Sequence, residues 1–215
     1  MRPRVLTILG VASALTLGLA ILASLALTPG FSYYYTSLSA LGNTDTNSSA
    51  APVFNVGLAL AGLLMLAFAA LVSVRARDHR VLVWTVPLAV TAIALAMVGL
   101  FPENLPGVIH RVVSGLLFLM VSVTMLSYGF LSLAVGARRV GSLALVFGLF
   151  NTFIWVTTWP WSGTVNQWSV WPWPEVAIQE LFTAGMLAAW LIIVALQMST
   201  IRPATAPTQQ VGRGR

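Results

Sequence analysis

The sequence predicts an all-α membrane protein, a bundle of six transmembrane helices with the N- and C-termini in the cytoplasm. Hydrophobic residues make up 58% of the chain and charged residues 7%, whereas a soluble domain has about 25% charged residues. Six apolar segments each reach the roughly 20 residues that cross a bilayer as a helix. Barrel strands are shorter and alternate polar with apolar residues, so a β-barrel is not indicated. The placement of the arginines sets the orientation.

Residues 1–199 are predicted to form a single transmembrane domain. We expect its helices at about residues 5–27, 54–74, 81–101, 108–135, 140–159 and 175–198. The first segment follows Arg2 and Arg4, as a secretory signal would, but its apolar run is longer than a typical signal core. We therefore expect it to remain as a helix. Residues 200–215 are polar and contain prolines at positions 203 and 207, so we predict a disordered cytoplasmic tail.

Cytoplasmic connections of membrane proteins carry an excess of Arg and Lys. All eleven basic residues of this chain are Arg, and six crossings place only Arg111 on the side opposite the termini. The other ten are Arg2, Arg4, Arg75, Arg77, Arg80, Arg138, Arg139, Arg202, Arg213 and Arg215. This distribution predicts a multi-pass protein of the cell membrane. It also accounts for the net charge of +6 without nucleic acid, because the aromatic residues that such a surface needs lie on the other side.

The composition excludes several kinds of site. The chain has no Cys, which excludes disulfides, thiolate metal sites and a Cys nucleophile. His79 and His110 fall on opposite sides of the membrane, and neither has the spacing to a second ligand that a zinc or haem site requires. We expect no metal and no cofactor.

Two connections on the outer side are rich in aromatic residues. The first, 28–53, contains the Tyr33–Tyr35 run, and the last, 160–174, contains Trp161, Trp168, Trp171 and Trp173. Tyr and Trp favour the membrane–water boundary, so we expect both connections to cap the bundle. Asn47-Ser48-Ser49 is a glycosylation sequon in the first of them; the sequence alone leaves open whether Asn47 is modified.

Small residues at four-residue spacing predict close helix contacts within the bundle. They occur as Gly10, Ala14 and Gly18, as Gly57 and Ala61, and as Ala144 and Gly148. Asn151 lies at mid-membrane, where an amide usually bonds across helices. Asn55 is expected to cap a helix or to clamp a loop.

Ionisable residues on the outer side are the candidates for function. Glu180 lies about five residues inside the sixth segment, where an ionised carboxylate needs a partner or water. We expect Arg111, at similar depth, to pair with Glu180 or Glu103. This arrangement has two readings: a buried ion pair that fixes helix register, or a polar site for a headgroup or a proton.

A catalytic arrangement is a third alternative. His110 and Glu103 could activate Ser37 or Ser39 as a nucleophile. No Gly-x-Ser-x-Gly elbow supports it, so we assign no catalytic residue.

Several short motifs resemble one family. They are Tyr35-Thr36-Ser37-Leu38-Ser39-Ala40-Leu41-Gly42, Phe54-Asn55-Val56-Gly57, Gly99-Leu100-Phe101-Pro102 and His110. The chain is similar over about residues 5–198 to a broad prokaryotic family of six-helix membrane proteins that is known only as a domain of unknown function. The resemblance implies the fold but no activity, and the Trp-rich last connection is unusual for the family.

We hypothesise that the outer side holds a pocket for a membrane lipid or another amphiphile. Its expected lining residues are Tyr35, Ser37, Ser39, Asn55, Glu103, His110, Arg111 and Glu180. Two alternatives stay open: an accessory subunit with protein partners within the membrane, and a membrane-embedded hydrolase or transferase acting on lipid headgroups.

Overall fold

The computed structural model describes residues 4–76, 78–105, 108–158 and 176–200. These residues form six long α-helices and two short 3-10 helices, with no strand in the described ranges. The elements are α1 (Arg4–Ala26), η1 (Leu38–Gly42), α2 (Ala50–Arg75), η2 (His79–Val81), α3 (Leu82–Leu100), α4 (Ile109–Ala134), α5 (Arg138–Thr158) and α6 (Ala177–Thr200). Each long helix is long and apolar enough to cross a membrane, which confirms the predicted six-helix membrane fold.

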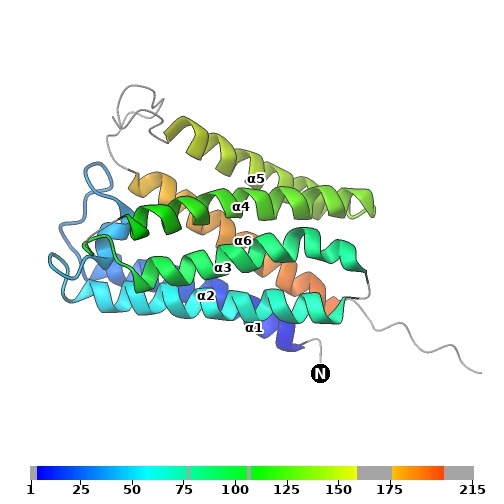
Figure 1. Cartoon of the computed structure of the whole chain (residues 1–215), viewed down its shortest axis with the longest axis horizontal. Helices are drawn as coiled ribbons and strands as arrows, with labels where there is room; N and C mark the ends of the chain where they lie inside the picture. The colour runs from blue at the N-terminus through cyan, green and yellow to red at the C-terminus, as the bar shows by residue number, and fades with distance from the viewer. Residues whose placement is uncertain (1–3, 77, 106–107, 159–175, 201–215) are drawn as a thin grey trace, which may run out of the picture.

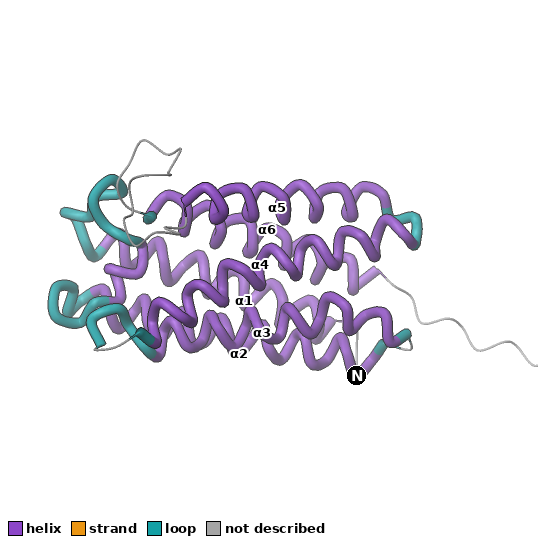
Figure 2. Tube along the Cα trace, turned by 45° about the horizontal axis from the view of Figure 1, so that its top comes forward, coloured by secondary structure: helices purple, strands orange, loops and turns teal. Residues whose placement is uncertain are grey.

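The long helices run roughly side by side along the long axis of the bundle (Figures 1 and 2), and their contacts follow an almost closed ring. Each of α1 to α4 packs extensively on the next helix along the chain, and α1 also packs on α6. By contrast, α5 and α6 make only sparse contact. In Figure 1, α5 leans away from the remaining helices toward the end where residue 158 lies. The bundle is therefore tight around α1 to α4 and loose beside α5.

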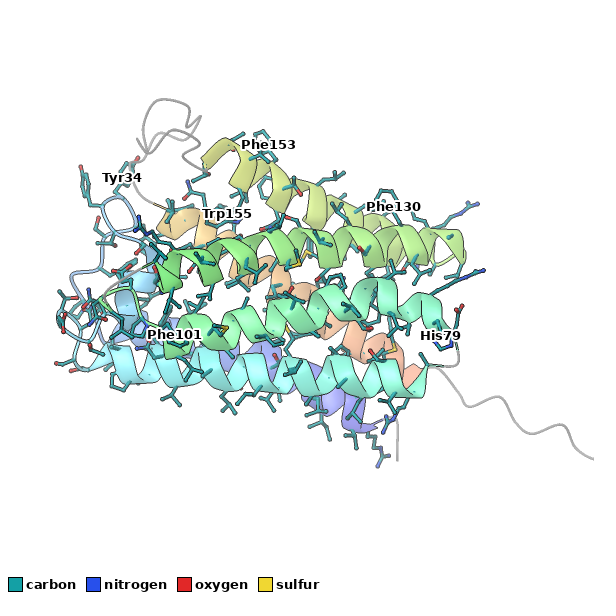
Figure 3. All side chains as sticks on the ribbon, viewed as in Figure 1. Tyr34, His79, Phe101, Phe130, Phe153 and Trp155 are labelled. Carbon is teal, nitrogen blue, oxygen red and sulfur yellow. The ribbon has the colours of Figure 1, made fainter. Side chains whose placement is uncertain are left out.

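The two ends of the bundle differ in composition. One end, here called the arginine end, carries Arg4, Arg75, Arg80, Arg138 and Arg139. The other, here called the loop end, is formed by residues 27–49, 101–105 and the first turns of α4 and α6. Tyr34 and Phe101 lie at the loop end in Figure 3, and His79 lies at the arginine end.

The second helix begins at Ala50, earlier than the predicted start at Phe54. The sequence suggested a later start because Pro52 and the preceding Ser/Thr/Asn residues are typical of a loop. Pro52 lies in the first turn, where a helix needs no N–H from it and tolerates its fixed φ.

Close approach at small residues holds the tight part of the ring. A Cβ added to Gly10 would come within 2.6 Å of Ala195 Cβ, and one added to Gly148 would come within 2.8 Å of Leu126 Cγ. Gly57 is equally crowded, against Ala20. Gly18 differs, because no described atom lies within 4 Å of its Cβ position. The predicted small-residue contacts thus hold at Gly10, Gly57 and Gly148 but not at Gly18.

Candidate functional site

The first connection folds back into the loop end of the bundle. Its short helix η1 is capped at its start by Ser37, whose Oγ accepts a hydrogen bond from the Ala40 N–H at 3.1 Å. Leu38 and Leu41 of η1 are buried in the hydrophobic core. Because this turn satisfies part of its own backbone and buries two leucines, η1 closes the loop end as a plug.

Asn55 fastens the end of that plug to α2. Its Nδ2 donates to the Gly42 carbonyl oxygen at 2.9 Å. Asn55 is the sixth residue of α2, so it clamps the loop and does not cap the helix. A Cβ on Gly42 would collide with the Asn55 amide oxygen, which explains why a glycine fits at this position.

Glu103 binds the start of the plug. Its Oε2 accepts from Ser37 Oγ at 2.9 Å and from Ser39 Oγ at 3.1 Å. The two serine hydroxyls are also 3.1 Å apart. The structure therefore brings together three of the predicted site residues, as a carboxylate held by hydroxyl donors.

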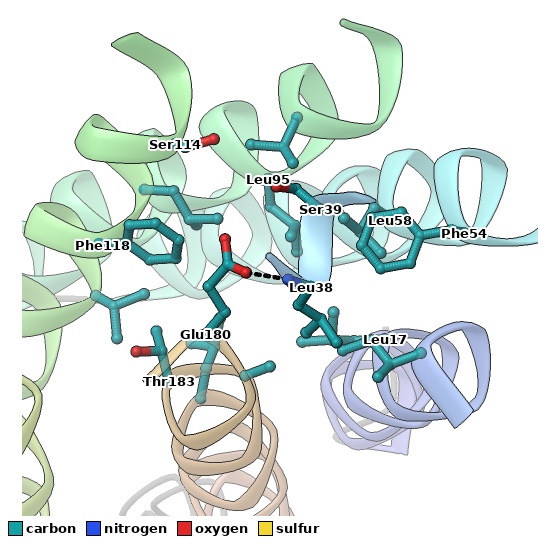
Figure 4. A pocket seen from close by; sticks show the side chains of 16 residues that line it. Leu17, Leu38, Ser39, Phe54, Leu58, Leu95, Ser114, Phe118, Glu180 and Thr183 are labelled. Carbon is teal, nitrogen blue, oxygen red and sulfur yellow. Dashed lines mark hydrogen bonds between the residues drawn. The ribbon is translucent and has the colours of Figure 1, made fainter. Parts of the chain in front are cut away.

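Glu180 reaches the same plug from α6 (Figure 4). It is the fourth residue of α6, 9% exposed, and its carboxylate accepts from the Leu38 backbone N–H. A backbone N–H at the start of η1 has no partner within so short a helix, and a carboxylate is a strong acceptor for it. Glu180 thus ties α6 to η1.

His110 bonds to neither carboxylate among the described residues. Its Nδ1 lies 2.7 Å from the Phe101 carbonyl oxygen, and its Nε2 lies 3.3 Å from Ser114 Oγ. Since a carbonyl only accepts, Nδ1 carries the proton when the ring is neutral, and Nε2 accepts from Ser114. The arrangement in which His110 and Glu103 act together on Ser37 or Ser39 is therefore not formed. Both serines bond to Glu103, whereas His110 bonds to Ser114.

The prediction that Arg111 pairs with Glu180 or Glu103 is wrong. Arg111 is exposed, and within the described residues no ion pair joins it to Glu103 or Glu180. Both carboxylates accept from donors of the plug instead. Tyr35 is 74% exposed and lines none of the cavities described below.

An internal cavity lies beneath the plug, with a volume of about 50 Å³. Of the predicted site residues, only Ser39 and Glu180 line it, together with Ser114, Thr183 and mainly apolar side chains (Figure 4). A volume of this size holds a few water molecules. It is far below the roughly 300–1,000 Å³ of a typical small-molecule site.

A much larger hollow, here called the α4–α5 groove, lies on the flank of the bundle and has a volume of about 870 Å³. Its lining is apolar apart from three side chains, Arg111, Ser122 and Thr152. The remaining lining residues are Val108, Val112, Gly115, Phe118, Leu119, Val123, Leu126, Trp155 and Val156. Arg111 is thus the one predicted site residue that belongs to this groove.

A row along α4 could have indicated the groove. Arg111, Gly115, Leu119 and Val123 recur every fourth residue and therefore share one helix face. Sequence reasoning missed it because nothing in the sequence shows that α5 leans away from this face. The side chains of α5 that line the groove face it only because α5 is tilted away from α4.

Behind the groove, a buried hydrogen-bond network joins three helices. Trp155 Nε1 donates to Thr183 Oγ1 at 2.8 Å, and Thr183 Oγ1 donates to Asn151 Oδ1 at 2.7 Å. Asn151 Nδ2 donates to Ser122 Oγ at 2.8 Å and to the Phe118 carbonyl oxygen at 3.1 Å. Asn151 therefore bonds across helices, and Trp155 points inward in Figure 3 while Phe153 points away from the bundle.

Three other features of the sequence concern glycosylation, metal binding and the Trp-rich connection. The Asn47 Nδ2, which a glycan would occupy, donates to the Ala40 carbonyl oxygen at 2.7 Å. In the described part of the chain, no group of three or more His, Asp or Glu side chains is placed to hold a metal ion. The Trp-rich connection and the tail from residue 201 lie outside the described residues.

Comparison with protein-family models matches residues 10–197 to the family described as "Protein of unknown function (DUF998)". No curated protein and no solved structure matches the chain. The match spans all six helices, and it confirms the resemblance to a membrane-protein family of unknown function. This chain is therefore a multi-pass membrane protein that belongs to the DUF998 family.

Proposed function

We propose that this protein binds a lipid or another amphiphile in the α4–α5 groove. The observation that carries the proposal is the groove itself, a hollow of about 870 Å³ with apolar walls and, among its described lining residues, one cation, Arg111, at its loop end. Its volume falls within the rough range of 300–1,000 Å³ for small-molecule sites. A polar end above an apolar trough matches the two halves of an amphiphile.

This location replaces the pocket expected from the sequence. Most of the expected polar residues are engaged with η1 or with neighbouring backbone, and the cavity beneath η1 measures only about 50 Å³. A hydrocarbon chain therefore has room in the flank but not in the interior. The plug residues are better explained as the structure that closes the loop end.

Packing gives the groove a reason to be filled. Within a bilayer, association depends on van der Waals contact and polar interactions, because lipid tails are as apolar as the side chains they replace. An unfilled concave wall loses dispersion contacts. A chain seated along Leu119, Val123 and Trp155 would recover them.

We further propose that the protein lies in the cell membrane with its arginine end in the cytoplasm. Arg75, Arg80, Arg138 and Arg139 mark that end, and cytoplasmic connections carry such an excess. The groove then opens its polar end toward the outer headgroup layer.

A groove-filling substitution tests the proposal. We expect Leu119→Trp to lower the amount of lipid that stays bound during extraction, measured by native mass spectrometry of the intact protein. The control is Leu60→Trp. Both leucines are exposed, at 57% and 48%, each is the eleventh residue of its helix, and Leu60 lines no cavity described above.

Equal lipid retention by the two Trp variants would overturn the proposal. So would a second polypeptide that co-purifies with the parent protein and is lost from Leu119→Trp, because the groove would then be an interface with a partner subunit.

A further inference from the structure

We infer that the amphiphile is an anionic phospholipid whose phosphate binds Arg111. This inference rests on the proposed function, because it assigns the headgroup of the molecule in the α4–α5 groove. It is carried by the position of Arg111, by the lack of a partner for it among the described residues, and by the distribution of polarity along the groove.

Arg111 lies where a headgroup would lie. It is the third residue of α4, at the loop end, and its side chain is exposed and lines the groove. The residues that line the groove further along α4, such as Leu119 and Leu126, lie progressively further from the loop end, within the membrane span. The partial positive charge of the helix start adds to that of the guanidinium.

The charge of Arg111 is not neutralised by the described part of the chain. Glu103 accepts from Ser37 and Ser39, Glu180 accepts from the Leu38 N–H, and neither forms an ion pair with Arg111. In the sequence, Arg111 is the one Arg or Lys between Arg80 and Arg138. An anion from outside the chain would complement it.

The two other polar side chains of the groove each have a hydrogen-bond partner inside the protein. Thr152 Oγ1 donates to the Gly148 carbonyl oxygen at 2.8 Å, and Ser122 Oγ accepts from Asn151 Nδ2 at 2.8 Å. The part of the groove away from Arg111 therefore presents a mainly apolar surface, which suits the acyl chain of a lipid and not its headgroup. Among the described lining residues, Arg111 is the one with a charged donor.

A phosphate is the best chemical match for that end. The guanidinium presents five N–H donors in a planar fork that binds phosphate oxygens in pairs. Zwitterionic phospholipids carry a cationic group that offsets the attraction, whereas phosphatidylglycerol has none. One basic residue near an anionic lipid surface contributes about 1 kcal/mol, which corresponds to about a fivefold preference.

The test is a competition between two lipids with identical acyl chains. The protein is equilibrated with equimolar dioleoyl phosphatidylglycerol and dioleoyl phosphatidylcholine, and the ratio of bound lipids is measured by native mass spectrometry. We expect about a fivefold preference for phosphatidylglycerol. Arg111→Gln should abolish it, and Arg111→Lys, which keeps the charge but loses the planar fork, should keep part of it.

Arg138→Gln is the matched control, since Arg138 is an exposed arginine at the other end of the bundle. It should leave the preference unchanged. Loss of the preference in Arg138→Gln, or its persistence in Arg111→Gln, would overturn the inference.

The lipid inference and the proposed function fail in different ways. If Leu119→Trp lowers lipid retention but Arg111→Gln keeps the preference, the groove binds an amphiphile and Arg111 does not select it. If Leu119→Trp and Leu60→Trp retain lipid equally, the groove itself is not the site and both proposals fall.

Discussion

At the scale of single residues, Thr183 shows how one hydroxyl can hold a helix in place. It accepts from Trp155 Nε1–H and donates to Asn151 Oδ1, so it satisfies two buried polar groups of α5 from α6. All three side chains are buried. Since α5 and α6 otherwise make sparse contact, these bonds are the main polar link between the two helices in the described part of the chain.

We predict that Thr183→Val destabilises the protein by about 1–2 kcal/mol, because the indole N–H and the amide oxygen lose their buried partner. Titration of the folded protein with SDS in mixed micelles measures the free energy of unfolding. Thr152→Val is the control, since Thr152 Oγ1 bonds to the backbone of its own helix, and we expect a change within about 0.5 kcal/mol. Equal effects of the two variants would show that the network does not fasten α5.

Arg111 shows what the sequence could not determine at this scale. Its depth follows from its place at the start of an apolar segment, and that depth was correct. Its direction depends on the rotation of α4 about its own axis, which packing against α3 and α5 decides. That rotation turns Arg111 to the flank, away from Glu103 and Glu180.

At the scale of elements, the six helices were predictable because a bilayer demands long apolar stretches whose backbone groups bond within the segment. The plug η1 was not, because five residues of mixed character carry no periodic signal. Its position depends on contacts far apart in sequence, from Leu38 to Glu180 and from Gly42 to Asn55. Short polar motifs such as Ser37 to Gly42 thus indicated a special segment without showing its fold.

The tilt of α5 is the element-scale feature that creates the candidate site. On one side it leaves the α4–α5 groove, and on the other a hollow of about 370 Å³ that Phe147, Phe182 and Met186 help to line. The buried network anchors α5 at Asn151 and Trp155, so the helix is held near its loop end while its flanks stay open.

At the scale of the whole molecule, the charge asymmetry predicts its orientation. The chain has no Cys, so a single introduced thiol reports one position. A membrane-impermeant maleimide applied to intact cells should label Tyr35→Cys at the loop end. Val135→Cys, exposed at the arginine end, should react only after the membrane is permeabilised.

The reverse labelling pattern would place the arginine end outside. The groove would then open toward the inner leaflet, and the proposed orientation would be wrong while the bundle itself would stand.

The location of bound lipid tests the central claim most directly. Phosphatidylglycerol with a photoreactive diazirine in its acyl chain is incorporated into nanodiscs with the protein, irradiated, and its attachment sites are mapped by peptide mass spectrometry. We predict attachment concentrated on the walls of the α4–α5 groove, above all at Leu119 and Val156. Attachment spread evenly over the exposed residues of all six helices, with Leu60 labelled as strongly as Leu119, would contradict the account.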